Sequence, residues 1–255
     1  LSGLFVGKEG EILLNGTEIS QYTKADLTKF FGVIHQDFHL FPMSVRDNIR
    51  VGEELSEEEI QNAVNQLEVR KKIRNLDQSI SREFADDGLV LSGGESQQLM
   101  LARIIANRYP FVILDEPTSA VDPISRRSFW QIIHALAIGG TTMVVTTHFM
   151  EEAEHCDEMV FLDAGKMVAE GSPKKLKESI KGTLVSIASD DSIKLREEIK
   201  KRIPVEDAYI FGRELRVLVA PQDLPLLSDW QYKIIEPTME DVFSYYLDKK
   251  GGGKV

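Results

Sequence analysis

"FVILDEPTSAVD", residues 111–122, is an apolar run that stops on two adjacent carboxylates, Asp115 and Glu116. An apolar run followed by Pro, Thr and Ser indicates a buried strand that ends in a turn. Ligands of an open parallel sheet bind at the carboxyl ends of its strands. Asp115 could hold Mg²⁺ there, and Glu116 could orient or deprotonate an attacking water. Alternatively, both acids simply cap the following turn and helix.

The pattern on both sides of this stretch predicts an α/β fold. Strand and helix signals alternate through the middle of the chain, which is typical of a parallel sheet covered by helices. The expected elements are a helix over 95–108, a strand over 111–114, a helix over 123–138, a strand over 142–147, a helix from 149 and a strand over 159–162. Upstream, we expect a strand over 11–14, a turn at 15–16, an apolar run over 30–35 and a capping box at 56–59.

The regular alternation of strand and helix signals ends after Gly171. Short strand-like runs then flank one charged helix, a pattern that predicts a small α+β domain. The runs are 183–187, 209–211 and 215–219, and the helix covers 192–202. Gly182 marks the expected boundary, which gives two domains, 1–181 and 182–255, the second ending in a flexible glycine-rich tail.

Composition narrows the possible functions. A formal net charge of −11 disfavours broad contact with nucleic acid phosphates, so we expect no nucleic acid partner. The apolar runs are far shorter than the ~20 residues that cross a bilayer. The single Cys156 and the lack of a basic segment followed by an apolar one favour the cytosol.

A second motif, "LSGGESQQ", lies at residues 91–98. Its glycines allow the backbone to approach a ligand, and the helix that follows aims unpaired N–H groups forward, which favours phosphate. Taken by itself, "SGG" is more often an ordinary turn before a helix.

Together the motifs resemble the nucleotide-binding domain of an ATP-binding cassette (ABC) transporter. "LSGGESQQLMLARII" stands about twenty residues before "VILDEPTSAVD", and His148 follows the next strand. The resemblance covers residue 1 to about residue 180. It implies a P-loop NTPase-like cassette with a mostly parallel core sheet, a helical signature subdomain, and ATP and Mg²⁺ as cofactors.

The resemblance also implies residue roles around the metal and the attacking water. Gln36 matches the Q-loop glutamine, which contacts Mg²⁺ and the water and relays closure to the membrane domain. Asp115 matches the Walker B aspartate on Mg²⁺, and Glu116 matches the catalytic glutamate. His148 matches the switch histidine near the γ-phosphate.

Other positions match residues that act across a pair of cassettes. Ser92, Gly93, Gly94 and Glu95 match the signature loop, which binds the γ-phosphate of ATP held by the opposite subunit. Glu95 stands where the family more often has Gln. Asp122 matches the D-loop aspartate at the seam between the two cassettes.

The chain departs from the family pattern at its start. The resemblance places the phosphate loop before Leu1, so we expect the printed chain to lack it. Gly3 to Lys8 mimics such a loop, but the spacing is one residue short and Glu9 replaces the Ser or Thr that should bind Mg²⁺. A carboxylate there would repel triphosphate.

Different segments of the chain resemble different branches of the family. Residues from about 36 to 135 are similar to the cassettes of exporters. The segments "TTHFMEEAEHCDEMVFLDAGKMVAEGSP" and "EPTMEDVFSYYL" look like the cassettes of drug-resistance and ABC-2 type transporters. The chain is therefore either a natural intermediate or a composite. Val45 to Ile49 is the expected docking segment for the membrane partner, and a plain amphipathic helix is the alternative.

The expected function is an ATPase subunit that energises an ABC transporter of the exporter type through ATP-driven dimer closure. Its partners would be transmembrane subunits or domains and a second cassette, at the inner face of the cell membrane. Two alternatives stay open: a non-catalytic cassette that lends its signature loop to a partner, and a soluble ABC ATPase outside transport.

Overall fold

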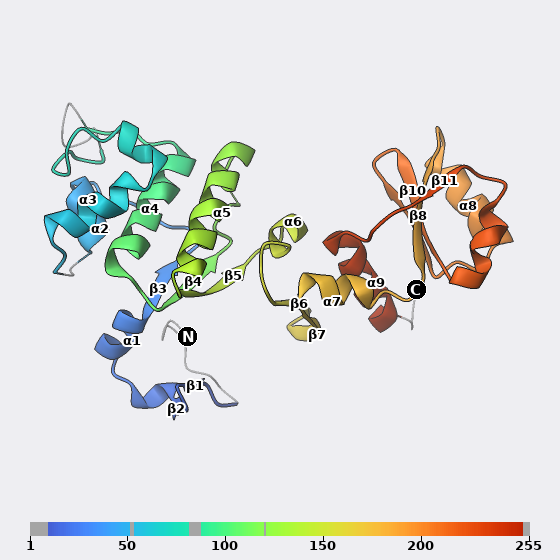
Figure 1. Ribbon diagram of the computed structural model, residues 1–255, viewed down its shortest axis with the longest axis horizontal. Coiled ribbons are helices and arrows are strands. Elements are labelled where there is room, and N and C mark those ends of the chain that lie inside the picture. Colours follow the sequence, from blue (N-terminus) through green and yellow to red (C-terminus); the bar gives the residue numbers. More distant parts are fainter. Residues whose placement is uncertain (1–9, 52–53, 82–87, 120, 252–255) are drawn as a thin grey trace. The chain divides into compact units, whose positions relative to one another are not determined.

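The computed structural model describes residues 10–51, 54–81, 88–119 and 121–251 (Figure 1). The chain contains two compact units, residues 1–148 and 149–255. The predicted domain boundary between residues 181 and 182 stays a prediction, because a compact unit need not coincide with a domain. Within the described residues, no helix combines the length and the apolar character needed to cross a bilayer.

The first unit opens with a short hairpin. Strands β1 (Leu13–Leu14) and β2 (Thr17–Glu18) pair antiparallel around the predicted turn at Asn15 and Gly16. Both turn residues have positive φ, 51° and 79°, as a two-residue hairpin turn requires. The turn prediction is confirmed, but the strand begins at Leu13, so the predicted start at Glu11 is wrong.

A parallel sheet forms the centre of this unit. Its strands are β3 (Phe31–Ile34), β4 (Phe111–Asp115) and β5 (Thr142–Thr146), in the order β3-β4-β5. Ile34 faces Leu114 in the register, and both side chains are fully buried. Because all pairings are parallel, the carboxyl ends of the three strands meet at one edge of the sheet.

A group of helices packs around one long helix, α4 (Gly93–Asn107). Helices α2, α3, η2 and α5 all contact α4, and this group matches the expected helical subdomain (Figure 1). The helices of this unit are η1 (Ile19–Gln21), α1 (Lys24–Phe30), α2 (Val45–Arg50), α3 (Glu57–Asn65), η2 (Glu68–Lys71), α4 and α5 (Pro123–Ile138). The predicted capping box of Ser56 and Glu59 starts α3, because each residue's side chain accepts the other's backbone N–H.

The second unit begins with a short helix and a two-stranded ribbon. Strand β6 pairs antiparallel with β7, where we expected a further strand of the parallel sheet. That expectation is wrong for the pairing observed, because a turn at Ala164 and Gly165, both at positive φ, returns the chain directly onto β6. The elements are α6 (Met150–Ala153), β6 (Met159–Asp163), β7 (Lys166–Gly171) and α7 (Pro173–Glu178).

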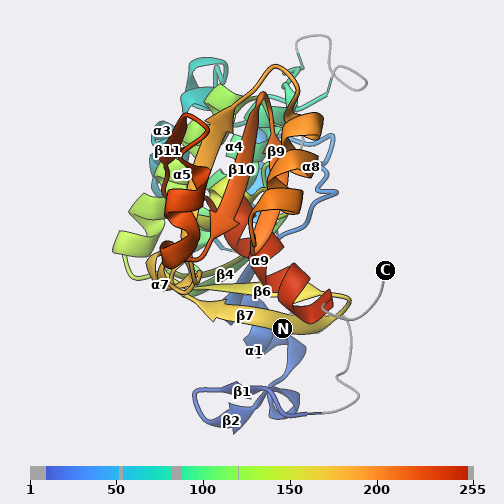
Figure 2. The ribbon, with the colours of Figure 1, turned by 90° about the vertical axis from the view of Figure 1, so that its right-hand side faces the viewer.

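A four-stranded antiparallel sheet follows, in the order β11-β8-β10-β9. Helix α8 (Ser192–Arg202) packs on one face of it (Figure 2), where Ile199 and Leu215 are fully buried. The remaining elements are β8 (Thr183–Ala188), β9 (Asp207–Phe211), β10 (Glu214–Val219), η3 (Pro221–Leu227), β11 (Tyr232–Ile234) and α9 (Met239–Gly251). The predicted α+β character of this region is confirmed.

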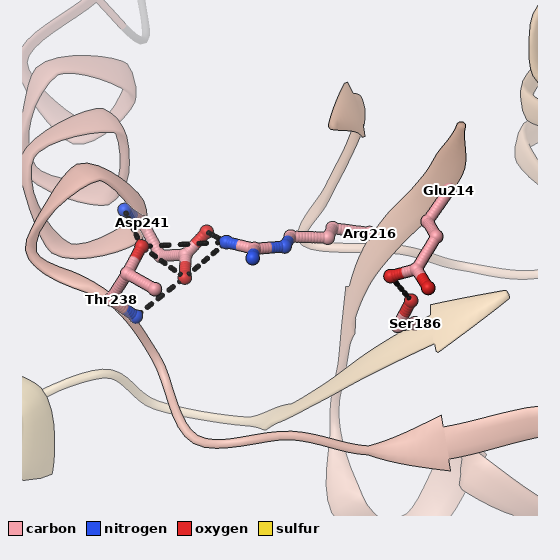
Figure 3. A network of polar contacts seen from close by, with 5 residues as sticks. All are labelled: Ser186, Glu214, Arg216, Thr238 and Asp241. Atoms are coloured by element: carbon pink, nitrogen blue, oxygen red, sulfur yellow. Dashed lines mark hydrogen bonds and ion pairs between the residues drawn. The ribbon is translucent and has the colours of Figure 1, made fainter. Parts of the chain in front are cut away.

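A buried ion pair fastens the start of α9 to β10 (Figure 3). The Nη1 atom of Arg216 donates to both carboxylate oxygens of Asp241, at 2.7 and 2.8 Å. The backbone N–H of Thr238 donates to the same carboxylate at 2.6 Å, and the guanidinium lies 3.6 Å from the centre of the Phe211 ring. Only 10% of the Arg216 side chain and 3% of the Asp241 side chain are exposed. Between the neighbouring strands β8 and β10, the hydroxyl of Ser186 donates to Glu214.

Candidate active site

The carboxyl edge of the parallel sheet brings the predicted acids into one hydrogen-bonded cluster. Asp115 is the last residue of β4 and lies opposite Thr146, the last residue of β5. The hydroxyl of Thr146 donates to Asp115, and the backbone N–H of Glu116 donates to the carbonyl and hydroxyl oxygens of Thr146 at 3.0 and 3.1 Å. These hydrogen bonds therefore connect the ends of β4 and β5 at the position of the two carboxylates.

His148 meets Glu116 at this edge. Its Nδ1 atom lies 3.0 Å from Glu116 Oε2, a distance at which a protonated Nδ1 donates to the carboxylate. The Glu116 side chain is 31% exposed and that of His148 is 56% exposed, so the pair faces solvent. Gln36, also exposed, follows the end of β3 by two residues at the same edge. The strands thus gather the four residues predicted to surround metal and water.

Glu116 has an unusual backbone conformation. Its φ is +42°, in the left-handed region that few residues other than glycine adopt. Such a conformation costs roughly 1–2 kcal/mol and persists only where its surroundings hold it. The two hydrogen bonds to Thr146 fix the backbone of Glu116 in this position. The carboxylate is thereby turned out of the strand toward His148.

The predicted signature loop forms the beginning of α4. Ser92 caps the helix: its hydroxyl accepts the N–H of Glu95, and the Glu95 carboxylate accepts the N–H of Ser92 at 2.8 Å. Lys72 pairs with the same carboxylate, with Nζ 2.6 Å from Oε1. Burial opposes the charge of Glu95, but the hydrogen bonds from Lys72 and Ser92 outweigh it and hold its pKa below the ordinary value. The capping acid is therefore ionised at neutral pH.

The two glycines of this loop differ in their surroundings. Gly93 is exposed, whereas Gly94 is buried against the start of α5. A Cβ atom added at Gly94 would lie 2.8 Å from the Ser125 hydroxyl oxygen and 2.9 Å from its Cβ. Glycine at position 94 is thus required by the packing of α4 on α5, and only Gly93 offers open backbone to a ligand.

Asp122 caps α5. Its Oδ1 atom accepts the N–H groups of Ile124 and Ser125 at 3.0 and 3.1 Å. The pKa of Asp122 is lowered most by a hydrogen bond with the Ser125 side chain and next by the Ser125 N–H, and the Ile124 N–H adds to this against the opposing effect of burial. The carboxylate is exposed, so it has an observed structural role beside the D-loop role expected from the sequence.

We expect Asp122→Ala to lower the midpoint of thermal unfolding by a few degrees, because two N–H groups at the start of α5 lose their acceptor. Asp122→Ser should keep the midpoint close to that of the wild type, since a Ser hydroxyl also caps helices well. Circular dichroism on heating measures both variants. Equal losses in the two variants would contradict the capping role.

The segment from Val45 to Ile49, predicted to dock the membrane partner, does not present its apolar side chains on the surface. Val45 and Ile49 are fully buried, so these apolar side chains of the expected docking segment are not available to a partner. Asn48, also buried, exchanges hydrogen bonds with the backbone of Phe41 at 2.8 and 2.9 Å. The loop held in this way presents Phe41 and Met43, about half exposed, on the surface.

The side chains at this edge could hold Mg²⁺ only together with oxygen atoms from a bound nucleotide and water. Among the described residues, no group of three or more His, Cys, Asp or Glu side chains is arranged to hold a metal. Mg²⁺ at nucleotide sites is usually held by one or two carboxylates together with phosphates and water. The Asp115 carboxylate and the Gln36 amide are oxygen ligands of the required kind.

Comparison with known proteins decides the family. The model of the family described as "ABC transporter" matches residues 1–119, which contain Gln36, the 92–95 loop and both acids. Residues 1–119 belong to the ABC transporter family. Gln36, the 92–95 loop, Asp115 and Glu116 therefore lie within the segment that matches the family, whereas Asp122 and His148 follow it. The fold is that of an ABC cassette.

Relatives of this ABC cassette are transport proteins. The chain is 33% identical over 180 residues to an ATP-dependent lipid A-core flippase of Francisella tularensis, covering 70% of this chain and 29% of the flippase. It is 33% identical over 177 residues to the glutathione/L-cysteine transport system ATP-binding/permease protein CydD of Bacillus subtilis, covering 69% of this chain and 30% of that protein. The chain thus spans less than a third of the length of these relatives.

A solved structure agrees with the ABC assignment. The chain resembles a bacterial Atm1-family ABC exporter with ATP bound, with a TM-score of 0.60 and 26% sequence identity. The likeness covers 70% of this chain and 31% of the exporter chain.

Two residues of the ABC cassette site were missed by the sequence interpretation. Thr146 joins Asp115 to Glu116, and its place at a strand end, two residues before His148 in "VVTTH", was the available signal. Lys72 pairs with Glu95 from 23 residues away, and no local pattern indicates that contact. The predicted decoy loop from Gly3 to Lys8 lies outside the described residues.

Proposed function

We propose that this chain is the ATP-binding and ATP-hydrolysing cassette of an ABC transporter of the exporter type. The observation that carries the proposal is the cluster at the sheet edge, where His148 and Glu116 lie 3.0 Å apart beside Asp115. A carboxylate base next to a metal-binding aspartate is the arrangement that phosphoryl transfer to water requires. The family match and the names of the relatives support this assignment.

Each residue has a distinct task in this proposal. Asp115 and Gln36 hold Mg²⁺, which when bound neutralises charge on the phosphates. Glu116 accepts a hydrogen bond from the attacking water and polarises it. His148 keeps the Glu116 carboxylate oriented and offers its ring to the γ-phosphate region. The phosphate cradle itself comes from a loop outside the described residues.

The proposed partners are a second cassette and a transmembrane part. Ser92, Gly93 and Glu95 lie at the start of α4, where backbone N–H groups point away from the helix and favour phosphate. They complete the site of the opposite cassette when two copies close head to tail, with Asp122 at the seam. The exposed Phe41 and Met43 are the apolar surface for the transmembrane part, at the cytoplasmic face of the membrane.

Mg²⁺-dependent ATP hydrolysis by the complete polypeptide tests this function. We expect His148→Ala to lower turnover by about 10²-fold, because it removes a group that orients the base. His134→Ala is the matched control, since His134 is exposed near the end of α5, which leads to the amino end of β5 and not to its carboxyl end. Equal turnover in both variants would remove His148 from the site.

The same preparations separate the alternatives. A wild-type protein that binds ATP without hydrolysing it would support a cassette that only lends its signature loop. Hydrolysis without any co-purifying membrane component would support a soluble ABC ATPase. Hydrolysis together with a membrane component supports the transporter.

A further inference from the structure

The acid at Glu95 poses an electrostatic problem for the proposed phosphate site. Its carboxylate lies at the start of α4, within hydrogen-bonding distance of the N–H of Ser92. An uncompensated carboxylate there would repel the phosphate groups that Ser92 and Gly93 are proposed to receive. It would also occupy the helix N-terminus that otherwise favours an anion.

Lys72 meets this carboxylate closely. Its Nζ atom lies 2.6 Å from Glu95 Oε1 and 2.8 Å from Oε2, so one ammonium bridges both oxygens. The Glu95 side chain is only 23% exposed, which leaves its charge less screened by solvent than that of an ordinary surface acid. The pair carries no net charge beside Ser92.

Residues close to Lys72 in the sequence are buried and hydrogen-bonded, which fixes the backbone at Lys72. It follows η2, in which Val69 is buried, and precedes Ile73, which is also buried. The N–H of Val69 donates to Gln98 Oε1 at 2.7 Å, and Gln98 belongs to α4, the helix that begins at the signature loop. The lysine is therefore tethered to the helix that carries its partner, and the pair is more than a chance meeting of two long surface side chains.

We propose that Lys72 is a positioning residue that neutralises Glu95 and so allows the 92–95 loop to receive the phosphates of a nucleotide held by the opposite cassette. This inference rests on the proposed function. It assigns Lys72 no contact with the nucleotide: the lysine acts through Glu95 alone. Loss of the lysine should therefore matter only while position 95 carries a negative charge.

ATP-driven closure in a complete polypeptide carrying Glu116→Gln tests the inference, because that change is expected to let closed pairs accumulate. The measurement is the ATP concentration at which half of the protein has associated, followed by sedimentation. We expect Lys72→Met to raise that concentration about tenfold, and Lys72→Arg to leave it near the parent value. Lys71→Met removes the same charge from the neighbouring exposed position and should change little.

The decisive variant combines Lys72→Met with Glu95→Gln, and we expect it to require the same ATP concentration as Glu95→Gln alone. Thermal unfolding of Lys72→Met near the parent midpoint shows that the change acts on closure. An unchanged ATP requirement in Lys72→Met overturns the inference. A double variant as impaired as Lys72→Met overturns it too, because Lys72 would then contact phosphate itself. A parent protein that never associates with ATP would instead refute the proposed function.

Discussion

Glu116→Gln in the complete polypeptide is expected to reduce steady-state ATP hydrolysis by at least about 10²-fold while ATP still binds. The substitution keeps the shape of the side chain, and the Gln carbonyl oxygen still accepts a hydrogen bond from His148, which lies 3.0 Å from the carboxylate. The change removes only the ability to take a proton from water. Bound ATP should therefore persist and hold two cassettes closed.

Phosphate release and retained radiolabelled ATP measure these two effects. Glu58→Gln removes the same charge in the exposed first turn of α3, far from Glu116 in the sequence. This variant should hydrolyse ATP at the wild-type rate. Hydrolysis by Glu116→Gln at the wild-type rate would exclude Glu116 as the base, whatever its geometry.

The sequence predicted the elements whose signals are local. The four apolar residues before Asp115 form β4 together with it, and the helix predicted over 123–138 begins at Pro123, a residue favoured at the first helical position. The capping box at Ser56 likewise needs only residues three apart. Strand ends and motif order were enough to place Glu116 and His148 at one edge of the sheet.

Contacts between distant segments could not be predicted in this way. Lys72 reaches Glu95 only because η2 is hydrogen-bonded to α4, and nothing near Lys72 in the sequence indicates this. The apolar spacing of Val45 and Ile49 fits a docking face and a buried face equally well, and packing against α4 decided for burial. The apolar run over 159–162 predicted a strand but not its partner. The turn at Ala164 and Gly165 decides that β6 pairs antiparallel with β7.

The largest stability effect is expected at Asp241 in the second unit. Asp241→Asn leaves the Arg216 guanidinium buried without its negative partner, because both carboxylate oxygens accept from it within 2.8 Å (Figure 3). Breaking a buried pair by removing one charge typically costs about 3–5 kcal/mol of unfolding free energy. Since this carboxylate also accepts the N–H of Thr238, the start of α9 should loosen with it.

Urea unfolding followed by tryptophan fluorescence measures this loss. Trp130 and Trp230 are the two tryptophans of the chain, so a Trp130→Phe background leaves Trp230 to report on the core beneath α8. Asp229→Asn is the matched control, because it breaks an Arg–Asp pair whose side chains are about half exposed and should shift the midpoint far less. If Asp241→Asn and Asp229→Asn shift the midpoint equally, solvent reaches the Arg216 pair and α9 is held to β10 by its apolar contacts alone.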